Sequence, residues 1–124
     1  MSTKFLAKAV AFGALTLGLG LTQAQAANCT IYFSGSPTGS IPASTTLVVI
    51  GPYTTSCTGS HTGSLTNLSN ASLDARIERN VNGSWKDVGG AILSALDQPP
   101  GTYRYVIVNS RGGNGNYKLK YSHP

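Results

Sequence analysis

Apolar and polar positions alternate with a period of two along much of this chain, in short runs. The clearest run is residues 72–79, SLDARIER, in which Leu73, Ala75 and Ile77 are separated by charged side chains. Successive side chains of a β-strand point to opposite faces, so this spacing predicts a strand with one buried face. Gly, Pro, Ser and Asn separate the runs, as is typical of turns. The pattern therefore predicts a series of short strands.

Three further segments predict particular kinds of strand or turn. Residues 45–53, TTLVVIGPY, are almost entirely apolar or β-branched, which predicts a strand buried on both sides that ends at Pro52. Residues 59–68, GSHTGSLTNL, are polar and are expected to form a short edge strand. The dipeptide Asn82-Gly83 is a strong signal for a tight hairpin turn.

The last 24 residues, GTYRYVIVNSRGGNGNYKLKYSHP, contain two alternating runs on either side of a glycine-rich segment. Glycine permits the positive φ angles that turns need, so the spacing predicts that the two runs pair as a closing hairpin. The register of this hairpin does not follow from the sequence. The pattern favours burial of Tyr103 and Tyr117, and for Tyr105 and Tyr121 it leaves core and solvent open.

No run shows convincing helical periodicity, and residues 89–100, GGAILSALDQPP, allow either a strand or a helical turn. Many short strands with no helix to cover a parallel sheet predict an all-β fold, an antiparallel β-sandwich, as one domain over residues 27–124. A core in a domain of this size is small. The expected core residues are Ile31, Phe33, Leu47, Val49, Leu73, Ile77, Trp85, Val88, Val106, Val108 and Leu119.

The first 26 residues have the pattern of a secretory signal peptide. Lys4 and Lys8 precede an apolar stretch over residues 9–21, and Ala24 and Ala26 stand at the small positions of an A-x-A cleavage site. The apolar stretch is shorter than the ~20 residues that span a bilayer, which argues against a membrane anchor. We therefore expect residues 1–26 to be removed and the protein to be secreted, to the periplasm or the exterior.

The charge of the mature chain is mildly basic. Residues 27–124 carry seven Lys and Arg against four Asp and Glu, with no cluster of five or more bases. Most of the acids alternate with bases, which is typical of a solvated surface. We expect no nucleic-acid partner, no membrane span and a monomer.

The two cysteines, Cys29 and Cys57, both lie in the mature part. In an oxidising compartment such a pair is expected to form a disulfide. Half of a metal site is the rival interpretation, but the only histidines are His61 and His123. A disulfide is therefore predicted, and no cofactor.

Common catalytic motifs are missing from the sequence. It contains no His-Glu-x-x-His, no Gly-x-Ser-x-Gly, no phosphate-binding glycine loop and no Cys-x-x-Cys. A serine triad would have to use His61 and Asp74, and nothing in the pattern activates a particular serine. The sequence predicts a protein that is not an enzyme.

Three ordered segments carry a resemblance to a known family: SGSHTGSL, then SLDARIERNVNGSWKDV, then the closing GTYRYVIVNSRGGNGNYKLKYSHP. Their order and spacing resemble the bacterial pre-peptidase C-terminal domain, as attached to secreted proteases. The resemblance covers residues 47–124 well and residues 29–46 loosely. It implies a compact antiparallel sandwich of jelly-roll type and a non-catalytic role as an appendage of exported hydrolases; in collagenases a similar domain binds substrate and calcium.

Two departures from the family pattern limit what the resemblance implies. The family's paired aspartates correspond to Ser72 and Asp74, so only the second is present, and Asp74 is at most a weak calcium candidate. No catalytic domain stands between the signal peptide and the module, so we expect a free-standing secreted protein.

Two functional hypotheses follow. The first is a secreted module that binds an extracellular surface, a polysaccharide or a protein, through aromatic and basic side chains of the closing hairpin. Its candidate binding residues are Tyr103, Arg104, Tyr105, Lys118, Lys120 and Tyr121. The second is a partner of an exported protease, as inhibitor or secretion chaperone, with residues 56–64, SCTGSHTGS, as the loop to suspect.

Overall fold

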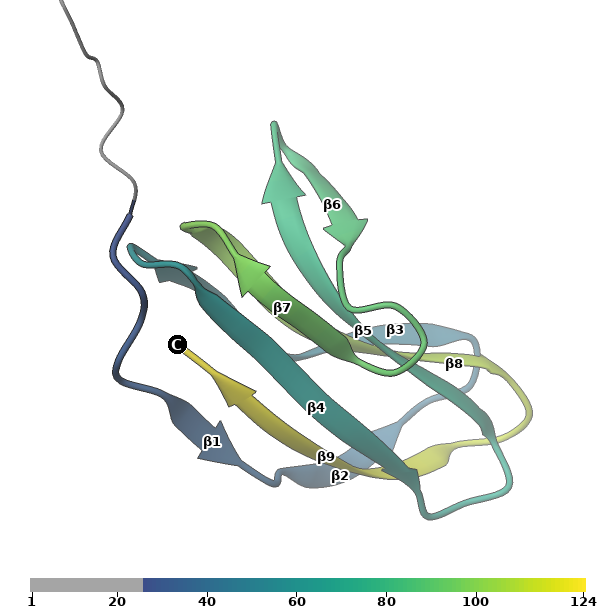
Figure 1. The fold of residues 1–124 in the computed structure, drawn as a ribbon. Helices are drawn as coiled ribbons and strands as arrows, with labels where there is room; N and C mark the ends of the chain where they lie inside the picture. Colours follow the sequence, from purple (N-terminus) through teal and green to yellow (C-terminus); the bar gives the residue numbers. More distant parts are fainter. Residues whose placement is uncertain (1–25) are drawn as a thin grey trace, which may run out of the picture.

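The computed structural model describes residues 26–124, which form nine β-strands in two facing sheets (Figure 1). The predicted signal peptide lies almost wholly outside the described residues. The all-β antiparallel sandwich is confirmed. The strands are β1 (Phe33–Gly35), β2 (Thr38–Ile41), β3 (Thr45–Thr55), β4 (Gly59–Asn67), β5 (Ser72–Val81), β6 (Ser84–Asp87), β7 (Ser94–Gln98), β8 (Gly101–Arg111) and β9 (Gly115–His123).

The strand order is that of a jelly roll. Strands pair first with last in nested fashion: β2 with β9, β3 with β8, β4 with β7, and β5 with β6. These four pairs form one long two-stranded ribbon. Its curling brings further strands together, so that β4 also pairs with β9 and β5 with β8. The result is a five-stranded sheet, in which β1 and β2 share one edge of β9 and the order continues β9-β4-β7, and a four-stranded sheet in the order β3-β8-β5-β6.

The predicted closing hairpin is wrong. β8 pairs with β3 and β5 in one sheet, whereas β9 pairs with β1, β2 and β4 in the other. Residues 112–114 therefore carry the chain from one sheet to the other. The buried Asn109 fixes this crossing, because its side-chain amide donates to the carbonyls of Gly113, Ile41 and Pro42. The glycines of this segment permit a turn, but their presence does not determine whether the strands on either side of the turn pair with each other.

The hairpin at Asn82-Gly83 is confirmed. It joins β5 to β6, with register partners from Val81↔Ser84 to Glu78↔Asp87. Both turn residues have positive φ, 54° and 87°, as the type I′ turn requires. A turn whose two residues dictate its geometry is the kind of feature that sequence predicts well.

Two strand assignments differ from expectation. β4 is not an edge strand, since it lies between β9 and β7, and its outward polar residues face solvent. β3 is an edge strand, open on one side, and Val48 is 39% exposed. It also continues past Pro52 to Thr55, with register shifts around that residue. Prolines are tolerated at edges because the missing N–H need not join a ladder.

The core lies between the two sheets. Its fully buried members include Ile41, Ile77, Tyr105, Ile107 and Leu119. Of the expected core, Ile77 and Leu119 are buried in this cluster, and Leu47, Val49, Leu73 and Val88 pack against it partly buried.

Five expected core residues do not belong to the inter-sheet cluster; one of them is Val108, which is only partly buried on β8. Ile31 precedes β1 and Phe33 begins this short edge strand, and their side chains are 71% and 58% exposed. Trp85 is half-buried beneath the guanidinium of Arg104. Val106 is buried but outside the cluster.

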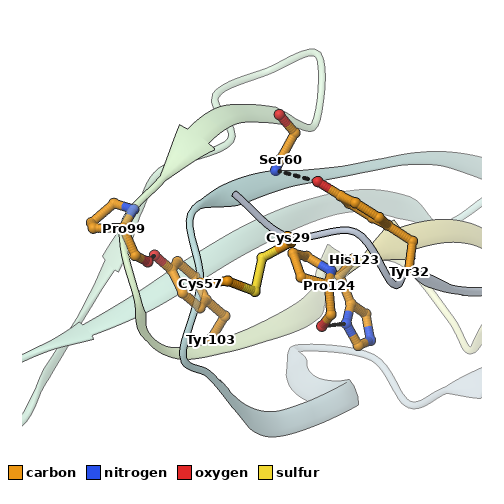
Figure 2. The surroundings of a disulfide bond; sticks show 8 residues. All are labelled: Cys29, Tyr32, Cys57, Ser60, Pro99, Tyr103, His123 and Pro124. Atoms are coloured by element: carbon orange, nitrogen blue, oxygen red, sulfur yellow. Dashed lines mark hydrogen bonds between the residues drawn. A yellow bond between two sulfur atoms is a disulfide. The ribbon is translucent and has the colours of Figure 1, made fainter. Parts of the chain in front are cut away.

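The disulfide Cys29–Cys57 is confirmed (Figure 2). It ties the segment before β1 to the β3–β4 connection, and it is flanked by backbone hydrogen bonds from Cys29 N to Thr58 O and from Thr58 N to Ala27 O. Within residues 26–124, no helix is long and apolar enough to cross a membrane.

Candidate functional site

The six predicted binding residues do not form one surface. They come from β8 and β9, which lie in different sheets. Tyr103 and Tyr105 point inward from β8 and have no exposed area, so the favoured burial of Tyr103 is confirmed and neither ring can serve as a binding residue. Each hydroxyl has a backbone acceptor that makes burial acceptable: Tyr103 donates to Pro99 O, and Tyr105 to Thr62 O at 2.8 Å.

The tyrosines of β9 also turn inward, each across a glycine on the neighbouring edge strand. Tyr117 pairs with Gly39 and Tyr121 with Gly35. The rings lie so close to these glycines that an added Cβ would meet Tyr117 Oη at 2.7 Å or Tyr121 Oη at 2.9 Å. Tyr117 is buried and Tyr121 is half-buried, so these rings pack the sandwich more than they display an aromatic patch.

Arg104 lies on the outer face of the four-stranded sheet and is already engaged. Its Nε donates to Glu78 Oε1 at 2.8 Å, and its guanidinium carbon lies 4.1 Å from the centre of the Trp85 ring. A charge-assisted hydrogen bond and a cation–π contact hold this side chain in place. Arg104 therefore has less capacity for a ligand than an unpaired cation.

A buried cluster of histidine and tyrosine rings fills the end of the sandwich near the disulfide. The ring of Tyr53 stacks on that of His123, with centres 3.8 Å apart, and the ring of His61 lies 4.0 Å from that of Tyr103. His61 has no exposed area, and its Nδ1 lies 2.6 Å from the Tyr53 hydroxyl.

Burial governs the ionisation of this cluster. Desolvation, and next the charge of nearby His123, lower the pKa of His61 to about 4. Desolvation also lowers the pKa of His123 and raises the pKa values of Tyr53 and Tyr105. All four side chains are therefore neutral at neutral pH, and the cluster behaves as packing.

The structure does not bring His61 and Asp74 together. Asp74 is exposed on the four-stranded sheet, where its nearest cation is Arg76, at 3.8 Å. Among the described residues, no three His, Cys, Asp or Glu side chains gather where they could hold a metal ion. The segment suspected as an inhibitory loop, residues 56–64, enters β4 at Gly59, and His61 within it is buried.

Lys118 and Lys120 are exposed on the outer face of β9, as predicted binding residues must be, but their neighbours come from strands other than the predicted hairpin partner. The alternate positions of the neighbouring strands β1, β2 and β4 carry hydroxyls on this same face. We call this surface the hydroxyl face. It comprises Ser34, Thr38, Ser40, Thr62, Ser64, Thr66, Asn116, Lys118, Lys120 and Ser122.

The register aligns these side chains in rows across the strands. Ser122 lies between Ser34 and Thr62, and Lys118 between Thr38 and Thr66. Such rows are about 4.7–4.9 Å apart from strand to strand and about 6–7 Å apart along a strand. The hydroxyl face is thus a regular grid of hydrogen-bonding groups. The strands that carry it, β1, β2, β9 and β4, lie side by side in one sheet (Figure 1).

A groove of about 390 Å³ lies on this face. It is lined by residues 34–36, 62–64 and 120–122, which come from the neighbouring strands β1, β4 and β9 and from the residue after β1. Its volume falls in the range of small-ligand sites, roughly 300–1,000 Å³. The side chains around it are short, apart from Lys120 and Tyr121.

The electrostatics of the face are simple. Strands β1, β2, β4 and β9 contain no Asp or Glu, and Lys118 and Lys120 are their only Lys or Arg. Within residues 26–124, the ion pairs Arg76–Asp74 and Arg104–Glu78 both lie on the four-stranded sheet. The two lysines therefore stand without acidic partners on these four strands, and the one acid of the five-stranded sheet, the exposed Asp97, lies on β7 beyond β4.

Comparison of the chain with protein-family models, with curated proteins and with solved structures found no match. The resemblance to pre-peptidase C-terminal domains stays a prediction that rests on the three segments quoted above. The hydroxyl face did have a signal in the sequence: hydroxyls occupy every second position in SGSPTGS, residues 34–40, and in TGSLT, residues 62–66.

Proposed function

We propose that this protein is a secreted, non-catalytic module that binds an extracellular polysaccharide through the hydroxyl face. The observation that carries the proposal is the alignment of Ser and Thr rows from β1, β2 and β4 on either side of the β9 lysines. Hydroxyls donate and accept hydrogen bonds, as sugar hydroxyls do, so a grid of them matches a polyhydroxylated polymer.

The sheet itself favours such a role. Side chains on a paired strand are held at fixed spacing, and a site built on strands is better ordered than one on loops. The groove over residues 120–122 offers a depression of ligand size within the same face. The family resemblance implies a non-catalytic appendage of exported proteins, which agrees with this proposal.

The test is retention on solid polysaccharides, with collagen beads and a panel of secreted proteases assayed alongside. The purified protein is compared with a triple variant of the hydroxyl face, T38A/S64A/T66A. A matched control, T46A/S72A/S84A, removes three exposed hydroxyls from the four-stranded sheet. We expect retention of the parent and of the control on at least one polysaccharide, and its loss in the face variant.

Two results would overturn the proposal. One is equal retention of the face variant and the control, because the hydroxyl face would then not be the contact. The other is stoichiometric inhibition of a secreted protease without retention on any polysaccharide. That outcome would favour the alternative role as partner of an exported protease.

A further inference from the structure

The two lysines of the hydroxyl face constrain the ligand beyond its being a sugar polymer. Lys118 and Lys120 stand two residues apart on β9, so their side chains leave the same face about 6–7 Å apart. Both are exposed, and no carboxylate of the described residues pairs with either one. A pair of ammonium groups without carboxylate partners, on four strands that hold no acid, is complementary to anions spaced along a chain.

Each lysine is embedded among hydroxyls. Lys118 has Thr38 on one side and Thr66 on the other, and Lys120 has Ser64 beside it and the groove at its base. An ammonium group only donates hydrogen bonds, whereas the hydroxyls both donate and accept. The ligand must therefore present negative oxygens near the middle strand and hydroxyls toward the flanking strands.

We infer that the ligand is an acidic polysaccharide whose anionic groups pair with Lys118 and Lys120 while its sugar hydroxyls bond to the flanking Ser and Thr side chains. This inference rests on the proposed function and adds the charge of the ligand to it. The sugar unit whose anion meets Lys120 sits in the groove between β1 and β4.

Two other anionic partners fit the face less well. Nucleic acids are bound through broad basic patches, and single strands also through stacked aromatic rings, whereas this face has two cations and no outward aromatic ring on β9 or β4. A membrane surface calls for several basic residues or an apolar side to insert, and the outward positions here are hydroxyls.

The test uses pairs of polymers that differ only in charge. Polygalacturonate is compared with its methyl ester, and dextran sulfate with dextran, which separates carboxylate from sulfate as the anion. Affinity is measured by calorimetry at low and high salt. The variant K118Q/K120Q is compared with K86Q/R111Q, which removes the same charge from exposed sites on the four-stranded sheet.

The parent and K86Q/R111Q are expected to bind one acidic polymer ~tenfold or more tightly than its neutral counterpart. K118Q/K120Q loses this preference, and salt weakens it in the parent because the Debye length shrinks from ~30 Å at 0.01 M to ~3 Å at 1 M. Equal weakening in both charge variants overturns the inference, since net charge alone would then explain binding.

Failure of the inference and failure of the proposed function are distinguishable. One outcome is that neutral and acidic polymers bind equally and that T38A/S64A/T66A abolishes the binding of both polymers. The hydroxyl face would then still bind sugar, and only the inference about charge would be wrong. If no polymer binds, the proposed function fails as well. Stronger binding to phosphatidylserine vesicles or to duplex DNA than to any polysaccharide would also overturn the inference.

Discussion

The hydroxyl of Tyr53 lies 2.6 Å from Nδ1 of His61, and this hydrogen bond joins β3 of one sheet to β4 of the other across the interior. His61 has no exposed area, and among the described residues its Nε2 has no hydrogen-bond partner. The Tyr53 hydroxyl is therefore the one polar group that compensates the buried imidazole. This hydrogen bond explains why a histidine is tolerated between the two sheets, because a buried polar group costs less when it has a hydrogen-bond partner.

Replacing Tyr53 by Phe should destabilise the protein. The substitution keeps the ring but leaves Nδ1 of His61 buried without a partner, which costs about 1–3 kcal/mol of unfolding free energy. Urea denaturation measures the loss. Tyr32→Phe is the control, because Tyr32 is 45% exposed and its hydroxyl accepts only a 3.2 Å hydrogen bond from Ser60 N. Equal losses in the two variants would contradict a special role for the Tyr53–His61 bond.

Acid should destabilise the protein through the same histidine. The pKa of His61 is about 4 in the folded state, against ~6.5 in an unfolded chain. Between these values the unfolded state binds the proton and the folded state does not, so stability falls as the pH drops from about 6.5 to about 4. His123, whose pKa is also lowered, acts in the same direction.

Urea midpoints measured from pH 7.5 to pH 4 test this dependence. The carboxylates titrate in the lower part of the range in any variant, so the informative quantity is the difference between the parent and His61→Gln. We expect the variant to show a shallower fall above pH 5, because glutamine has no proton to gain. Parallel curves would show that His61 is not the group responsible.

Gly39→Ala should be destabilising because of Tyr117. The new Cβ would stand 2.7 Å from the Tyr117 hydroxyl, and that ring is only 7% exposed and has little room to move. Overpacking of this kind costs about 1–3 kcal/mol. In the control Gly113→Ala the added Cβ meets no atom within 4 Å. Thermal unfolding compares the two, and a Gly39→Ala protein as stable as the control would contradict the packing described.

Removing the disulfide should lower stability without changing the fold of the two sheets. The bond joins residues 28 positions apart, Cys29 and Cys57, and such loops contribute about 3–4 kcal/mol on the chain-entropy model. For a domain of this size that corresponds to a fall in Tm of roughly 12 °C or more. Calorimetry of C29S/C57S, together with the parent under reductant, measures it. An unchanged Tm would show that the disulfide contributes nothing to stability.

Features set by neighbouring residues were predictable from the sequence. The period-two pattern of residues 72–79 became β5, with Ala75 and Ile77 buried, and Asn82-Gly83 became the β5–β6 turn. Each depends on the backbone preferences of a few adjacent residues. The disulfide was predictable for another reason, since a chain with two cysteines has only one intramolecular pairing available.

Features set by distant pairing were not predictable. The glycines of residues 112–114 suit a hairpin and a crossing between sheets equally, so the pairing of β8 and β9 depended on strands elsewhere in the chain. The polarity of residues 59–68 suggested an edge, although a central strand with one solvated face has the same composition. For the tyrosines, alternation shows which residues share a face but not which face is covered.

The central claim is that the hydroxyl face is the binding surface, and amide chemical-shift mapping tests it most directly. Isotopically labelled protein is titrated with polygalacturonate oligomers, and the shifts are assigned to residues. The account predicts changes concentrated at residues 34–40, 62–66 and 116–122, with residues 74–78, 84–87 and 104–108 unaffected. Changes concentrated on the second group, on the outer side of the four-stranded sheet, would contradict it.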